Sequence, residues 1–320
     1  MSPPPPPHPA PVLVRGARFE GRRVDLVTAE GRISRIGSDL EAPAGAEVFD
    51  ADGLTLWPGM VNTHHHLAQS LLKGLPAGID KGLAAWLPAV PYAAWPYIDP
   101  DILYTAALIG FSELLRSGCT TCADHHYLYD DRDPSEFEDA LFTAARETGI
   151  RFVLARGGAT TTGSHTGMRG AGIRGETLDT WLTRLTETVD ARHDPSPYAM
   201  TRVALAPTSL VHSVTADDLA LLAEFAREHG LRMHSHLKEV ARDDEIARER
   251  HGLNALEYAD SVGWTGPDVW FAHLVHLEAS DAQRLAETGT GLSHCPVSNC
   301  RLGSGICPVP ELAELGVPIS

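Results

Sequence analysis

Residues 56–66 read Leu-Trp-Pro-Gly-Met-Val-Asn-Thr-His-His-His, an apolar run that ends in three histidines. A β-strand sends alternate side chains to the same face, so His64 and His66 are expected to project together and His65 to point the other way. Two imidazoles side by side suit the coordination of one divalent metal ion. The segment therefore predicts a strand that ends at a metal site.

Three further strand-like runs also end in histidine. The histidines are His234 and His236 after residues 231–233, His273 after 269–272, and His294 after 290–293. Four such endings are hard to obtain from packing alone, whereas one metal pocket explains them together.

From residue 56 onward, a strand, a polar loop and an amphipathic helix alternate repeatedly. This alternation predicts an α/β fold, a (β/α)8 barrel of the TIM type in preference to an open doubly wound sheet. The histidines support the barrel because barrel enzymes carry their chemistry at the carboxyl ends of the strands. The predicted strands cover residues 57–63, 119–124, 151–156, 202–206, 231–235, 269–272, 290–293 and 317–320. The predicted helices cover about residues 100–117, 134–148, 176–192, 216–229, 254–262 and 279–288.

The chain is expected to have three parts. Residues 1–11 are rich in proline and predict a disordered tail. Residues 12–55 read as short strands with glycine turns, as in part of a small β-sandwich domain. Residues 56–320 form the barrel, which we expect to be incomplete at its carboxyl end, with the eighth strand cut short.

Composition excludes several classes of partner. A formal net charge of −16 argues against nucleic acid, whose binders need a concentrated basic face. No apolar run approaches the roughly 18 residues of a membrane span, and the start lacks a secretory signal, so we expect a cytoplasmic protein that binds no membrane. Among the five cysteines, Cys119 and Cys122 are expected to be a buried thiol pair in preference to a redox site. Homo-oligomerisation is left open.

Neutral imidazoles suit a borderline metal ion. We therefore expect one divalent ion, zinc or alternatively iron, to be held by His64, His66 and His236. Such an ion lowers the pKa of a bound water towards neutrality, which predicts a hydrolytic reaction.

Two further residues are candidates for proton transfer. Glu239 lies three residues after His236, where it is expected to carry a proton to a ring nitrogen or a leaving amine. Its alternative is a solvated charge within the charged run 238–245. His273 is expected to stabilise developing charge, and its alternative is a structural role.

Four motifs of the chain are similar to those of a known family. Pro-Gly-Met-Val-Asn-Thr-His-His-His, His-Ser-His-Leu-Lys-Glu, Ala-His-Leu-Val and His-Cys-Pro-Val-Ser-Asn-Cys-Arg-Leu together resemble the amidohydrolase superfamily, from about residue 12 to the end. Residues 64–74, 117–129 and 151–160 resemble its branch of heterocycle deaminases and chlorohydrolases, in particular the enzymes that deaminate isoxanthopterin and 8-oxoguanine.

The resemblance implies specific roles. His64, His66 and His236 would be metal ligands, Glu239 and His273 would handle protons, and an aspartate after the eighth strand would complete the site. The sequence ends at Val-Pro-Ile-Ser, residues 317–320, before such an aspartate. We therefore expect the chain as given to have an incomplete metal site and very low turnover.

Four residues are candidates for substrate binding. Gln69 either reads the amide edge of a purine-like ring or faces solvent. Arg156 either holds a ring oxygen or pairs with a loop carboxylate. Trp86, with Trp95 and Tyr97 in the same connection, either caps a flat heterocycle or packs the loop. His294 ends its strand on the same side as the metal-site histidines.

The predicted function is a metal-dependent aminohydrolase that replaces the exocyclic amine of an oxidised purine or pterin with oxygen and releases ammonia. One alternative is hydrolytic removal of chloride or an alkylamine from a triazine-like ring. The other is an inactive metal-binding remnant that acts as an interaction module.

Overall fold

The computed structural model describes residues 9–130, 132–161 and 174–320, which form two compact units, Met1–Gly59 and Met60–Ser320. Most of the predicted proline-rich tail, residues 1–8, lies outside the described residues. Within these described ranges, no helix is long and apolar enough to cross a membrane.

The first unit is a four-stranded sheet in the order β3-β2-β1-β4. Its strands are β1 (Val12–Phe19), β2 (Arg22–Ala29), β3 (Arg32–Gly37) and β4 (Glu47–Asp50). The first three form an antiparallel meander, and β4 pairs with β1 in parallel. Glu20 and Gly21 both have positive φ between β1 and β2, as a two-residue turn that matches strand twist requires.

The second unit contains, within the described ranges, seven parallel strands whose spatial order follows the chain. They are β5 (Met60–His65), β6 (Cys119–His126), β7 (Arg151–Arg156), β8 (Thr201–Leu205), β9 (Met233–Leu237), β10 (Val269–His273) and β11 (Gly291–Ser293). Each lies within about three residues of a predicted strand. The α/β barrel fold predicted from the alternating pattern is therefore confirmed.

Contacts between the first and last strands bring the sheet close to closure. The Thr63 hydroxyl of β5 donates to Ser293 Oγ of β11 at 2.7 Å, and the Trp270 indole of β10 donates to the Thr63 carbonyl at 3.0 Å. Where the eighth strand was predicted, Ile319 forms a parallel bridge to Leu292. The carboxyl ends of β5 and β9–β11 are thereby held around one point.

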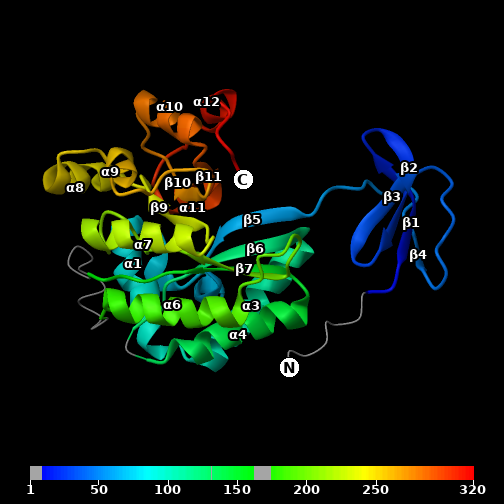
Figure 1. Cartoon of the computed structure of the whole chain (residues 1–320), viewed down its shortest axis with the longest axis horizontal. Coiled ribbons are helices and arrows are strands. Elements are labelled where there is room, and N and C mark those ends of the chain that lie inside the picture. The colour runs from blue at the N-terminus through cyan, green and yellow to red at the C-terminus, as the bar shows by residue number, and fades with distance from the viewer. Residues whose placement is uncertain (1–8, 131, 162–173) are drawn as a thin grey trace. The chain divides into compact units, whose positions relative to one another are not determined.

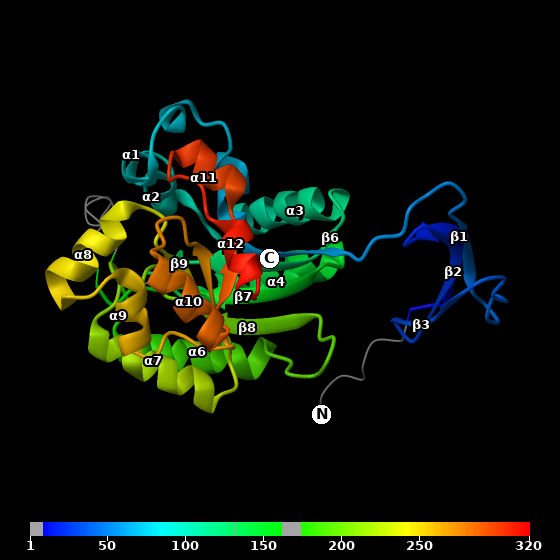
Figure 2. The same ribbon diagram turned by 90° about the horizontal axis from the view of Figure 1, so that it is seen from above.

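Helices surround these strands, most of them on the outer side (Figures 1 and 2). They are α3 (Pro100–Arg116), α4 (Pro134–Thr148), α6 (Leu178–Arg192), α7 (Ala216–Glu228), α8 (Ala241–His251), α9 (Ala255–Ser261), α10 (Ala279–Thr288), α11 (Pro296–Leu302) and α12 (Val309–Glu314). Side chains cap several of them: the Asp99 carboxylate accepts from Ile102 N at the start of α3, and Asn254 begins α9 in a capping box. The predicted helices are all present.

Helix α8 was not predicted. Its segment carries charged residues on nearly every side, so no apolar stripe of helical period reveals it. It is nevertheless anchored, because Asp243 and Asp244 are buried and accept hydrogen bonds from Glu239 N and Lys238 Nζ. Buried charge pairing thus adds to the small apolar contact that Ile246 and Ala247 make with the core.

The connection between β5 and α3 is built from short helical turns. These are η1 (Leu67–Leu72), η2 (Pro76–Gly78), α1 (Leu83–Ala89), α2 (Pro91–Ala94) and η3 (Trp95–Tyr97). Proline begins or interrupts most of them, which keeps each one short. The Arg301 guanidinium of α11 donates to the Gly78 carbonyl at 2.9 Å, so this connection is tied to the segment that follows β11.

Candidate metal centre and active site

Four histidines meet at the carboxyl ends of the strands. His64 lies in β5 and His66 directly after it, His125 lies in β6 and His236 in β9, and one nitrogen of each lies within 4.8 Å of those of the others. The Nε2 atoms of His66 and His236 are 3.2 Å apart. The structure thus brings together all three residues predicted as metal ligands and adds His125 as a fourth.

His65 lies on the other face of the strand. Its ring is beside Gly110 of α3, where a Cβ atom added to the glycine would come within 3.6 Å of it. The alternation of a β-strand therefore separates His65 from its two neighbours, as expected from the sequence.

Hydrogen bonds orient the clustered rings. His66 Nδ1 is 2.8 Å from the His125 carbonyl oxygen, and His236 Nδ1 is 2.8 Å from the Thr208 carbonyl oxygen. A carbonyl only accepts, so in each ring Nδ1 carries the proton and Nε2 keeps its lone pair. Ligating histidines are commonly held in this way, by a partner on the other ring nitrogen.

A chain of two hydrogen bonds orients His64 through His234. His234 Nδ1 lies 2.9 Å from the Trp270 carbonyl oxygen and so carries the proton of that ring. Its Nε2 is then the acceptor for His64 Nδ1, 2.8 Å away, which leaves the Nε2 lone pair of His64 free. His234, the first histidine of the motif at residues 234–236, therefore orients His64 of the motif at residues 64–66.

Burial keeps these imidazoles neutral. Loss of solvation, reinforced by neighbouring histidines, holds the pKa values of His64 and His66 well below their usual range, and burial lowers the pKa of His236 to about 4. Neutral imidazole is the form that binds a metal ion. The donor set therefore fits a borderline divalent cation at neutral pH.

Glu239 and His273 face each other beside this cluster. Glu239 Oε2 is 3.5 Å from His273 Nε2, and the Asn299 side-chain oxygen engages His273 Nδ1 at 2.8 Å. Glu239 is only 7% exposed, and burial raises its pKa to about 7. The structure therefore disagrees with a solvated charge at Glu239. A carboxyl group with this pKa can both accept and release a proton near neutrality.

A buried lysine holds the turn that carries Glu239. Lys238 is fully buried, and its ammonium pairs with Asp244 at 2.6 Å and Asp281 at 2.9 Å. Its backbone adopts a left-handed φ of 53°, and His273 has a φ of 81°. Non-glycine residues rarely adopt this conformation, and such strain persists where surrounding contacts impose it.

A cavity of about 1440 Å³ opens above the histidines. Its wall contains polar groups of the cluster and also apolar side chains from the β5–α3 connection and α11. Three predicted substrate residues, Gln69, Trp86 and His294, lie in its wall. Gln69 donates to the Tyr127 hydroxyl at 2.9 Å, so its amide is held in place. Of the other aromatic residues in this connection, Trp95 is buried and Tyr97 is 78% exposed.

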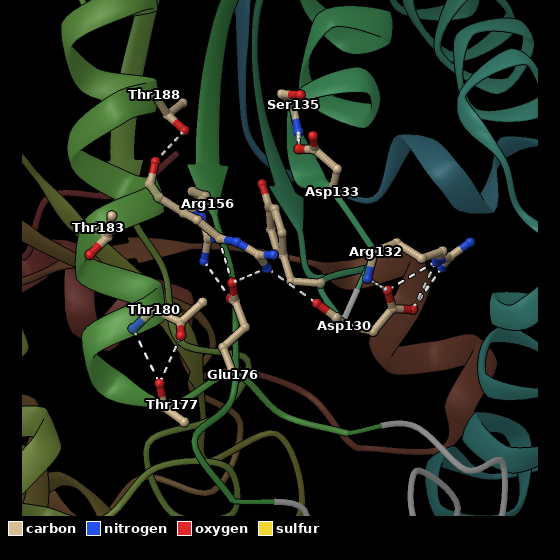
Figure 3. Close-up of polar contacts among 12 residues, drawn as sticks. Asp130, Arg132, Asp133, Ser135, Arg156, Glu176, Thr177, Thr180, Thr183 and Thr188 are labelled. Carbon is tan, nitrogen blue, oxygen red and sulfur yellow. Dashed lines mark hydrogen bonds and ion pairs between the residues drawn. The ribbon is translucent and has the colours of Figure 1, made fainter.

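Arg156 lies elsewhere. Its guanidinium is fully buried, forms a two-point ion pair with Glu176 at 2.7 and 2.9 Å, and sits over the ring of Tyr129 at 3.8 Å. Figure 3 shows this pair between β7 and the start of α6. Arg156 is not among the described residues that line the cavity. The placement corresponds to the alternative interpretation, a salt bridge with a loop carboxylate.

Comparison with known proteins places this site in a family. The model of the amidohydrolase family matches residues 55–320, and the chain belongs to that family. The predicted resemblance is thereby confirmed.

Curated relatives include an isoxanthopterin deaminase from an unknown prokaryotic organism, 44% identical over 96% of this chain and 64% of its own length. The 8-oxoguanine deaminase of Pseudomonas aeruginosa is 38% identical over 92% of this chain and 65% of its own length. The chain thus spans just under two thirds of these two relatives.

Solved structures agree on the fold. An amidohydrolase from an environmental sample of the Sargasso Sea is 37% identical, with a TM-score of 0.80 over 97% of this chain and 68% of that structure. Atrazine chlorohydrolase from Arthrobacter aurescens TC1, crystallised with zinc, is 25% identical, with a TM-score of 0.89 over 97% of this chain and 71% of that structure.

Proposed function

We propose that this protein is a metal-dependent aminohydrolase of nitrogen heterocycles, with an oxidised purine or a pterin as substrate. The observation that carries the proposal is the cluster of neutral imidazoles from His64, His66 and His236 beside the Glu239–His273 pair. The likeness to isoxanthopterin and 8-oxoguanine deaminases supports the substrate class.

In this proposal the three histidines hold one divalent ion, zinc or alternatively iron, through ring nitrogens that their hydrogen bonds leave free. Such an ion supplies a water activated as a nucleophile at neutral pH. The similar chlorohydrolase structure that contains zinc supports the same kind of ion.

The reaction adds water to the ring carbon that bears the amine, breaks the carbon–nitrogen bond and releases ammonia. Glu239 takes the proton of the attacking water and delivers one to a ring nitrogen or to the leaving amine, which its pKa of about 7 permits. Asn299 fixes the ring of His273 through Nδ1 and leaves Nε2 directed at Glu239; when Nε2 carries a proton, His273 stabilises the charge that develops on the attacking oxygen.

The cavity wall orients the heterocycle. Gln69 presents an amide that Tyr127 holds in place, and that amide reads the substrate's own amide edge. Trp86 offers a flat face for stacking, and His294 contributes a polar group from the end of β11. A small-molecule partner fits this cavity.

Ammonia release from isoxanthopterin and from 8-oxoguanine, measured side by side on the zinc-loaded chain, tests the proposal. We expect slow but measurable turnover of one or both, loss of that turnover after chelation, and its return with added zinc. Absence of ammonia from both, with zinc bound, would contradict the proposal and favour an inactive metal-binding remnant.

A second candidate is hydrolysis of a triazine-like ring, favoured by the likeness to the chlorohydrolase structure. The same assays, with chloride and alkylamine release measured on triazines, separate it from deamination. Release of chloride or alkylamine without ammonia from either purine or pterin would select this candidate.

A further inference from the structure

Cys295 belongs to the wall of the same cavity but not to the nitrogen cluster. It follows β11 by two residues and is half-buried. Its sulfur and one ring nitrogen each of His64 and His273 lie within 4.8 Å of one another. This group shares only His64 with the cluster of His64, His66, His125 and His236.

The donors of this second group have few competing contacts. Nδ1 of His273 is engaged by Asn299, which leaves Nε2 towards Glu239 and the cavity. His64 has Nδ1 engaged by His234 and so has one nitrogen left for a cation. The Cys295 thiol makes a long contact of 3.5 Å to the Ser293 carbonyl oxygen, which is given up when the thiol proton leaves, while the sulfur also accepts from the His273 backbone N–H, a bond that a thiolate keeps.

Sulfur changes which cation this group prefers. Two imidazoles and a thiolate suit soft or borderline ions. A set of imidazoles alone suits borderline ions such as zinc or iron and does not favour softer ones. When the metal–sulfur bond forms, the thiol loses its proton to solvent, and the thiolate offsets one of the two positive charges. A partly neutralised ion is less costly to hold in a buried site.

We propose that His64, His273 and Cys295 form a second cation site that takes thiophilic divalent ions such as cadmium and competes with the nitrogen site for His64. The proposal concerns binding and does not rest on the proposed deaminase function. Its consequence is that such ions displace an ion held by the nitrogen cluster and withdraw His273 from the Glu239 pair.

Cadmium chloride titrated into the chelator-treated full chain at neutral pH tests this site. Ultraviolet absorbance records the cadmium–thiolate charge-transfer band, and metal analysis after gel filtration records what stays bound. We expect a band that saturates at one cadmium ion per chain. In zinc-loaded protein, we expect cadmium to release the zinc as the band appears.

Two serine variants locate the sulfur. C295S should lose the band, while C300S should keep it, because Cys300 is exposed and is not among the cavity-lining residues. C295S should still bind zinc through the nitrogen cluster, which also shows that the variant folds.

A band of undiminished intensity in C295S would overturn the site. Zinc retained alongside cadmium with a full band would overturn the competition for His64. Failure of the deaminase assays leaves both readouts unaffected, so the two proposals fail separately.

Discussion

Two buried polar clusters of the second unit are used differently. Around Arg156, ion pairs and a stacked ring engage both terminal nitrogens of the guanidinium, and the described residues there do not line the cavity. At the strand ends, hydrogen bonds engage one nitrogen of each clustered ring and leave the other free beside a cavity. Buried polar groups that bond to other buried groups of the protein stabilise the fold. Buried groups that keep a free lone pair beside a cavity are instead candidates for metal binding or catalysis.

Glu239→Gln should produce the largest loss of turnover that leaves the metal in place. An amide keeps the shape of the carboxyl group but cannot carry a proton, so kcat should fall about 10²–10⁴-fold, the usual worth of general acid–base catalysis. Steady-state kinetics and metal analysis on the same preparation check this.

Glu245→Gln is the matched control for that variant, because Glu245 lies on the same charged run, pairs with Arg242 and is exposed. It should leave kcat unchanged. Near-normal turnover in Glu239→Gln would remove the proton-transfer role from Glu239.

Arg156→Met should lower the free energy of unfolding by about 3–5 kcal/mol, because it leaves Glu138 buried without its cation and Glu176 with Arg184 alone, 3.0 Å away. Urea denaturation measures the change, and metal content should stay at the wild-type level.

Arg227→Met provides the comparison, since Arg227 forms a partly exposed pair with Asp268 at 3.0 Å. It should cost less than about 1 kcal/mol. A large loss of metal or of substrate affinity in a folded Arg156→Met protein would show that Arg156 contributes to the functional site.

His126→Phe should change how stability depends on pH. His126 is fully buried, and burial, with help from Arg156 and Arg132, lowers its pKa to about 3. The unfolded chain takes up this proton near pH 6.5, so the folded protein loses up to about 1.4 kcal/mol per pH unit as pH falls from about 6.5 towards 3.

The phenylalanine variant lacks that loss, so its stability should fall less steeply than that of wild type between pH 6.5 and 4.5. Urea denaturation at several pH values compares the two slopes. Parallel pH profiles would show that His126 titrates alike in the folded and unfolded chains.

Sequence patterns predicted the barrel and the meeting of His64, His66 and His236 because strand period and strand ends are local features with a fixed geometric meaning. The same reasoning missed His125, which lies within a buried strand whose sequence, Cys-Thr-Thr-Cys-Ala-Asp-His-His, has no polar alternation. It also left Arg156 open, since only tertiary structure decides whether a strand-end arginine meets a carboxylate or a cavity.

Helix α8 and Asn299 show the same limit. The helix is stabilised by carboxylates that meet Lys238 and Glu239 N, contacts that no periodic pattern records. Asn299 acts on His273 from 26 residues away. The Pro-Val-Ser-Asn run gave no local sign of that contact.

Metal content of the His64→Ala, His236→Ala and His65→Ala proteins, each purified with zinc and checked for folding by circular dichroism, tests the proposed centre most directly. Removal of His64 or His236 takes away a nitrogen that faces the cluster, while His65 lies on the far side of β5 beside α3. We expect the first two proteins to lose bound zinc and the third to retain it. Zinc lost from His65→Ala and kept by folded His64→Ala and His236→Ala would contradict a metal centre at these strand ends.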